Sequence, residues 1–174
     1  PDDHWYYVRS CIRQNFFPGS ERMFMEICRD VLKKDFYETE HHTTCGGIAY
    51  HCDTIPQETA MTIVARQFAL MTEAGYENYV ASCITSFGNY TEILETWHEF
   101  PELETRIREM LWKSCRKEFN KPKYLAHASD LIYKFRNDIA EKAKFRLIDK
   151  NTGEPLKVVE HIGCHYAKMF PSKG

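Results

Sequence analysis

Short apolar runs and longer stretches of helical periodicity alternate along the 174 residues of the chain. The aromatic and β-branched run at 5–8 predicts a β-strand, and the runs at 79–82 and 124–126 are interpreted in the same way. A further short strand is predicted near 36–37. The alternation of apolar and polar residues at 156–160 predicts a last one.

The intervening segments carry apolar residues at the three- and four-residue spacing of amphipathic helices. Thr54 is expected to cap the second of these helices and Gly75 to end it, whereas 41–53 is expected to be a loop. The charged helix that begins at Pro101 is expected to continue to Pro122. The predicted helices are 23–32, 55–74, 87–98, 101–121 and 129–142.

Repeated strand–helix units of this kind predict an α/β fold, with a mainly parallel sheet and helices on both faces. The length fits one domain, or one domain with an appendage. In parallel sheets of this class, ligands bind beyond the carboxyl ends of the strands. Functional residues are therefore sought directly after the predicted strands.

Cysteines occupy these positions. Cys11, Cys83 and Cys164 each follow a predicted strand, and Cys45 lies in the 41–53 loop. More than thirty residues separate one from the next, whereas zinc fingers keep their ligands a few residues apart. Successive strand–helix units would each place one cysteine at the same edge of one sheet, which explains this spacing. The pattern predicts a metal or redox site built from these four cysteines.

The remaining cysteines are interpreted differently. Cys28 and Cys115 lie on apolar helix faces, where a free thiol packs as a small hydrophobic group. Cys52 precedes a helix start, and both a structural and a functional role remain open for it.

Composition narrows the possible functions. A net charge of −2 gives no electrostatic basis for binding nucleic acid or an anionic membrane. No stretch approaches the roughly 18 apolar residues of a spanning helix, and the acidic start lacks the regions of a signal peptide. Seven cysteines are an odd number in a chain too large to need disulfides, so a reduced, cytoplasmic protein is expected.

Five motifs occur in an order and spacing that resemble the B-type subunit of heterodisulfide reductase, a member of the cysteine-rich CCG-domain family. The related iron–sulfur proteins of lactate and glycolate oxidation match less well. The motifs are Arg9–Cys11, Phe17–Glu21, Thr44–Gly47, Ala81–Gly88 and His161–His165.

The resemblance implies two CCG halves, of which 1–150 is the first and 151–174 the start of an incomplete second. In the family each half supplies a Cys, a Cys-Cys-Gly or Cys-Cys-Pro, and a Cys-x-x-Cys, whose sulfurs hold a noncubane 4Fe–4S cluster at which a disulfide is cleaved. Matched by position, Cys11, Cys45 and Cys83 would bind the cluster of the first half. Cys164 would open the second.

Two expected thiols are absent, because Thr44 stands in the central pair and Ser86 in the second place of the Cys-x-x-Cys. Neutral hydroxyls substitute poorly for a soft anionic ligand. The first half would then hold an altered cluster, a zinc ion or no metal. With the three thiolates, Cys52 or a nearby histidine would complete a tetrahedral zinc site. The histidines flanking Cys45 are His41, His42 and His51.

The resemblance also implies a role for His161 and His165, which flank Cys164. They are expected to donate hydrogen bonds to cluster sulfur or a proton to a leaving thiolate. Either group would act as a catalytic residue of the second half.

The sequence therefore predicts an iron–sulfur redox subunit that exchanges electrons with a small disulfide or thiol substrate. By the resemblance, its partners would be a ferredoxin-like iron–sulfur subunit and a flavin-containing subunit. The alternative is a non-catalytic α/β scaffold, zinc-bound or metal-free, that docks redox partners. A hydrolase with a cysteine nucleophile fits poorly, because one activated thiol would not explain several regularly placed ones.

Overall fold

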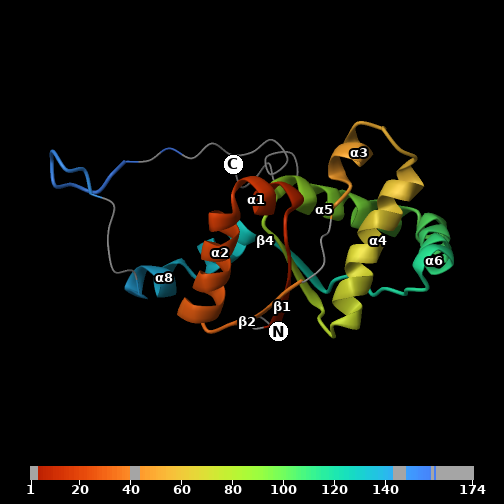
Figure 1. The fold of residues 1–174 in the computed structure, drawn as a ribbon, viewed down its shortest axis with the longest axis horizontal. Helices are drawn as coiled ribbons and strands as arrows, with labels where there is room; N and C mark the ends of the chain where they lie inside the picture. The colour runs from red at the N-terminus through yellow and green to blue at the C-terminus, as the bar shows by residue number, and fades with distance from the viewer. Residues whose placement is uncertain (1–3, 40–43, 143–147, 158, 160–174) are drawn as a thin grey trace.

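The computed structural model describes residues 4–39, 44–142, 148–157 and 159 (Figure 1). Four strands form one sheet in which every neighbouring pair is parallel, in the order β2-β1-β3-β4. The predicted parallel sheet is thereby confirmed. The strands are β1 (His4–Val8), β2 (Asp35–Glu38), β3 (Asn78–Ala81) and β4 (Tyr124–His127).

The sheet order contains a topological switch point. The chain leaves β1 and adds β2 on one side, then adds β3 on the other side of β1. The connections that follow β1 and β3 therefore run to opposite sides, and sheets of this class bind ligands beyond the carboxyl ends of the strands at such a point. The register pairs Val8 with Ala81 at this end of the sheet.

Alternation along β1 explains why helices cover both faces. Tyr6 and Val8 face a core built with α4 (Gln57–Glu73), α5 (Ile84–Glu99) and α6 (Pro101–Cys115). Trp5 and Tyr7 face the opposite core, built with α2 (Pro18–Glu26), its π-helical continuation η1 (Ile27–Val31) and α7 (Ala128–Lys134). All four side chains are almost completely buried, so the strand is apolar on both faces, as central parallel strands are.

Three shorter helices complete the described elements: α1 (Cys11–Phe16), α3 (Gly47–His51) and α8 (Arg136–Lys142). The helix α3 lies inside the segment expected to be a loop. The helix expected over 23–32 begins earlier, at Pro18, and the helix expected over 129–142 is split at Phe135 into α7 and α8.

The second long helix, α4, confirms its predicted end but not its predicted cap. The Gly75 N–H donates to the Thr72 carbonyl and the Tyr76 N–H to the Met71 carbonyl. Gly75 has a φ of +79°, which is the Schellman arrangement that favours glycine. The expectation that Thr54 caps this helix is wrong, because the N-cap is Pro56 and no side chain caps it.

The expectation that the charged helix continues to Pro122 is also wrong. The helix α6 ends at Cys115, where Arg116 adopts a left-handed conformation. Phe119 is nevertheless buried, because its ring packs against Phe68 and Trp97 and lies 4.0 Å from the Arg108 guanidinium carbon.

The strand predicted at 156–160 is not formed by those of its residues that the structure describes. Leu156, Lys157 and Val159 are exposed and lie outside any strand. An isolated antiparallel bridge joins Ile148 to Pro155 instead. Most of 151–174, including all of 160–174, lies outside the described residues, so its assignment to a second half stays a prediction.

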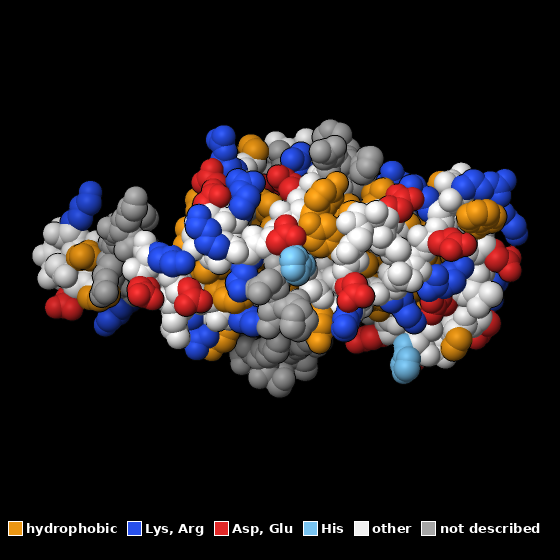
Figure 2. All heavy atoms as spheres, turned by 90° about the horizontal axis from the view of Figure 1, so that it is seen from below, with side chains coloured by type: hydrophobic (Ala, Val, Ile, Leu, Met, Phe, Trp, Pro, Cys, Tyr) orange, Lys and Arg blue, Asp and Glu red, His pale blue; other side chains and the backbone are white. Residues whose placement is uncertain are grey.

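Among the described residues, no helix combines the length and the apolar character that crossing a bilayer requires. Figure 2 shows one face of the molecule, on which basic and acidic side chains are interspersed. This mixture agrees with the small net charge of the chain.

Candidate functional site

Two of the predicted site cysteines lie at the switch point. Cys11 is the first residue of α1, just beyond β1, and Cys83 is the N-cap of α5, just beyond β3. Ser10 fixes the turn before Cys11, because its hydroxyl accepts a hydrogen bond from the Arg13 N–H at 3.2 Å. Both thiols are half-buried. These two cysteines thus flank the switch point of the sheet.

Cys45 lies near Cys11 and Cys83, on a loop whose backbone carbonyl groups accept hydrogen bonds from two helices. The Asn89 amide of α5 donates to the Cys45 carbonyl at 2.8 Å, and the Gln67 amide of α4 donates to the Thr44 carbonyl at 3.2 Å. Gly46 turns the chain with a φ of +64°, which favours glycine. The loop is therefore fixed in relation to both helices.

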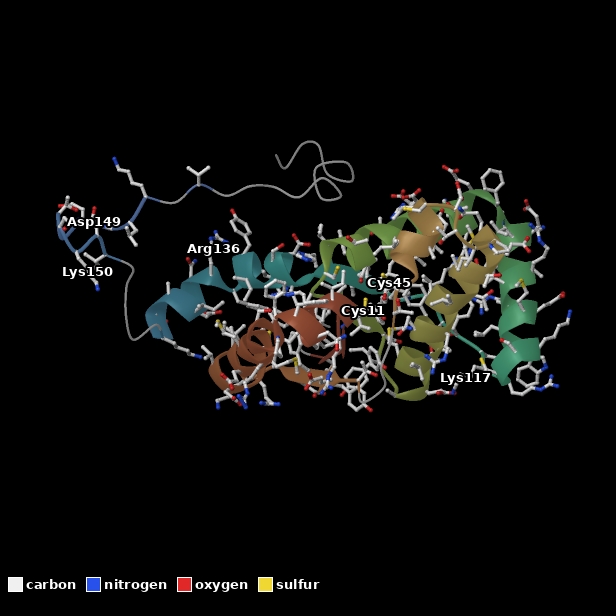
Figure 3. The ribbon with its side chains drawn as sticks, turned by 45° about the horizontal axis from the view of Figure 1, so that its top comes forward. Cys11, Cys45, Lys117, Arg136, Asp149 and Lys150 are labelled. Carbon is white, nitrogen blue, oxygen red and sulfur yellow. The ribbon has the colours of Figure 1, made fainter. Side chains whose placement is uncertain are left out.

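The three thiols lie within electrostatic range of one another. Burial raises the pKa of the Cys45 thiol, hydrogen bonds from the Ser86 hydroxyl and the Gly47 N–H lower it, and nearby Cys83 and Cys11 raise it further. The Gly47 nitrogen lies 3.3 Å from Cys45 Sγ. Figure 3 shows Cys11 and Cys45 next to each other. The structure thus brings together three cysteines that lie on separate segments of the chain.

A buried phenol, that of Tyr90, lies near this cluster. Burial raises the pKa of Tyr90 well above its ordinary value, and the charges of Cys45, Cys83 and Cys11 raise it further. One aromatic side chain is therefore close to all three thiols.

The metal site expected around these thiols is not preformed. Within the described ranges, no three side chains of His, Cys, Asp or Glu are grouped closely enough to hold a metal ion. Cys52 is exposed at the end of α3, and His51 Nδ1 lies 4.0 Å from Glu92 Oε2. Binding of a metal by Cys11, Cys45 and Cys83 would require their thiols to move closer to one another.

The two cysteines interpreted as structural lie away from the site, in the hydrophobic packing. Cys28 lies on η1 and is fully buried in the core that η1 forms with the sheet, and burial raises its pKa to about 12. Cys115 packs at the edge of the other core, where its thiol lies 3.4 Å from the Leu111 carbonyl oxygen.

Sequence reasoning missed a polar network at the same edge of the sheet. Arg13 Nη1 donates to the Ser82 carbonyl at 2.8 Å, and the Ser82 hydroxyl donates to Glu21 Oε1 at 2.7 Å. The His127 ring lies with Nε2 3.2 Å from the same Ser82 carbonyl. The motif at 17–21 contains Glu21, but nothing in its spacing indicates a buried carboxyl.

The charge state of this network follows from its burial. Burial raises the pKa of Glu21, and the acidic Glu38 adds to this, against the hydrogen bond that the Ser82 hydroxyl donates to the carboxylate. Burial also lowers the pKa of His127, although Asp130 opposes the shift. Both groups are thereby shifted toward their neutral forms.

Comparison with known proteins bears on what such a site does. No protein-family model matches the chain. The B-type subunit of the ferredoxin:CoB-CoM heterodisulfide reductase of Methanosarcina acetivorans is 22% identical over 176 aligned positions, which cover 97% of the chain. The chain is a distant relative of this heterodisulfide reductase protein. It spans 54% of the length of that protein, and the name of the relative suggests a redox-related role and an oxidoreductase subunit.

Likeness to this heterodisulfide reductase protein allows the predicted cluster to be tested against the residues present. Ser86, which stands where the family has a thiol, places its hydroxyl against Cys45. Thr44 directs its own hydroxyl to the Gly46 N–H at 3.3 Å. Three thiols and two hydroxyls do not fit a noncubane cluster held by five sulfurs, because a neutral hydroxyl binds iron poorly.

The other predicted site residues, Cys164, His161 and His165, lie outside the described residues, as do His41 and His42. Their roles stay predictions, and so does the role of Cys11, Cys45 and Cys83 as ligands.

Proposed function

We propose that the chain is a redox subunit of a heterodisulfide reductase-like assembly, with Cys11, Cys45 and Cys83 as the ligands of its N-terminal metal centre. The observation that carries the proposal is the convergence of these three thiols at the switch point of the sheet. Three soft thiolates suit a small iron–sulfur cluster or zinc.

The proposed reaction is the reduction of a small disulfide, or its reverse. Reduction consumes two electrons and two protons and yields two thiols. A ferredoxin-like iron–sulfur subunit would supply the electrons, and a flavin-containing subunit would complete the assembly. Cys164, with His161 and His165 beside it, would contribute to a second centre.

Anaerobic reconstitution with iron and sulfide tests the proposal. The expected result is visible charge-transfer absorption with bound iron and sulfide, reduced strongly in Cys83→Ala and unchanged in Cys52→Ala, whose thiol is exposed at the end of α3. Ser86→Cys is expected to increase cluster occupancy, because it adds a thiol beside Cys45. A wild-type protein without any iron-dependent spectrum would refute an iron–sulfur centre.

A zinc-bound or metal-free scaffold is the second candidate. The hydroxyls of Thr44 and Ser86 at two ligand positions favour it, and so does the burial that raises the pKa of Cys45 and disfavours its thiolate. Stoichiometric zinc without iron after anaerobic purification, or no metal at all, would select this function over the first.

A further inference from the structure

We propose that Arg13 is a positioning residue that fixes the separation of Cys11 and Cys83 before any metal binds. The inference rests on the proposed three-thiol centre, and it explains how two ligands that follow different strands are kept in place. Arg13 belongs to the helix that begins at Cys11, and its guanidinium bonds to the residue before Cys83.

The sheet itself stops setting this separation one residue before Ser82. Val8 and Ala81 form the last register pair between β1 and β3. Ala81 also forms the last register pair between β3 and β4, with His127. Beyond these pairs one chain enters α1 and the other enters α5. A connection between their first residues then has to come from side chains.

Two hydrogen bonds fix the backbone of Arg13 within α1. Its N–H donates to the Ser10 hydroxyl at 3.2 Å, and its carbonyl accepts from the Phe17 N–H at 2.7 Å. Ser10 is the N-cap of this helix and Phe17 is its C-cap. Arg13 and Cys11 therefore move together, since both belong to one short helix that is capped at each end.

The side chain of Arg13 makes the connection to the end of β3. Nη1 donates to the Ser82 carbonyl at 2.8 Å, and Ser82 directly precedes Cys83. Nε donates to the Ser20 hydroxyl at 3.2 Å and lies 3.8 Å from Glu21 Oε1. One guanidinium can make these contacts at the same time because its donors form a rigid, planar fork.

Ser82 is itself held in place, so a bond to its carbonyl defines a position. It is buried, and its hydroxyl donates to Glu21 Oε1 at 2.7 Å. His127 Nδ1 accepts from the Ser129 N–H at 3.3 Å, which leaves Nε2 to donate to the Ser82 carbonyl at 3.2 Å. Side chains from α1, α2 and the end of β4 therefore converge on the residue beside Cys83.

Thiol bridging in the reduced, metal-free full chain tests the role of Arg13. Dibromobimane becomes fluorescent when its two arms alkylate two neighbouring thiols, and peptide mapping identifies the pair. Monobromobimane measures how fast each thiol reacts singly. The wild type is expected to give a Cys11–Cys83 bridge. Arg13→Ala should lower the ratio of bridging to single alkylation at least roughly tenfold, because small misplacements of reacting groups are that costly.

Two further variants separate geometry from charge. Arg13→Lys keeps the positive charge but not the planar fork, so it should also lower the ratio, with less risk to folding. Arg22→Ala is the matched control, since Arg22 is exposed on α2 and pairs with Glu26 at 3.7 Å. It removes the same charge and should leave the ratio unchanged. A merely structural role of Arg13 would lower the melting temperature, measured alongside, without changing the ratio.

The outcomes distinguish this inference from the proposed function. The positioning role is overturned if the wild type forms no Cys11–Cys83 bridge, or if Arg13→Ala or Arg13→Lys keeps the wild-type ratio. An equal loss in Arg22→Ala would overturn it as well. The expected ratios in a protein that binds neither iron nor zinc would refute the metal centre and leave the role of Arg13 in place.

Discussion

A methyl group added at Gly47 would crowd the Cys45 thiol. A Cβ on this residue would lie 3.1 Å from Cys45 Sγ and 3.1 Å from Thr85 Cγ2, closer than ordinary van der Waals contact. Neither neighbour yields easily, because the Cys45 sulfur is hydrogen-bonded and Thr85 is β-branched and fixed on α5. Overpacking of this kind costs about 1–3 kcal/mol.

Alanine also favours helix over glycine by about 1 kcal/mol, which offsets part of that cost. Gly47→Ala is therefore expected to lower the free energy of unfolding by about 0–2 kcal/mol. Gly19→Ala is the matched control, since Gly19 lies near the start of α2 and its Cβ would meet nothing within 4 Å. It should gain up to about 1 kcal/mol.

Urea unfolding followed by circular dichroism measures both variants, and the expected gap between them is about 1–3 kcal/mol. Alkylation of Cys45 should also accelerate in Gly47→Ala, because the added methyl displaces its sulfur. Equal or greater stability of Gly47→Ala relative to Gly19→Ala would show that the packing around Cys45 is looser than described.

Three further predictions follow from burial. Because burial raises the pKa of Glu21 above its ordinary value of 4.5, the native state binds this proton more tightly than the unfolded state. Stability should therefore fall as the pH rises from about 4.5 through the native pKa, and urea titrations of Glu21→Gln should lack this component. Iodoacetamide followed by mass mapping should modify exposed Cys52 first and Cys28, whose pKa is about 12, last; early labelling of Cys28 would contradict its placement. Asn89→Ala should cost about 1–3 kcal/mol in urea unfolding because it leaves the buried Cys45 carbonyl without its donor, and a near-neutral result would show that the loop is held by other means.

The sequence predicts the strands and helices well where one local signal dominates. The run at 5–8 is aromatic and β-branched without interruption, and β1 occupies it. Gly75 ends α4 because a left-handed residue is required there. The cap at Thr54 fails because the Gln57 amide donates to the Tyr50 carbonyl of the preceding helix instead, a contact that spacing along the chain does not reveal.

The candidate site is likewise only partly predictable from the sequence. Cys11 and Cys83 directly follow strands and Cys45 lies in a loop. These positions can be read from the sequence, and the convergence of the three cysteines follows from them. The network of Arg13 and Glu21 does not, since it depends on α2 packing over the end of β3, sixty residues later in the chain. An alignment of residue types cannot distinguish a buried Glu on an amphipathic helix from an exposed one.

Ser86 differs from cysteine by one atom, and α5 already holds it against Cys45. Replacement of that oxygen by sulfur would change the donor set without moving a helix or a strand. The same scaffold can therefore be tuned between a three-thiol site and a richer one by a single substitution. Among relatives of this fold, the identity of the residue at this position would then report the chemistry of the centre more directly than overall sequence similarity does.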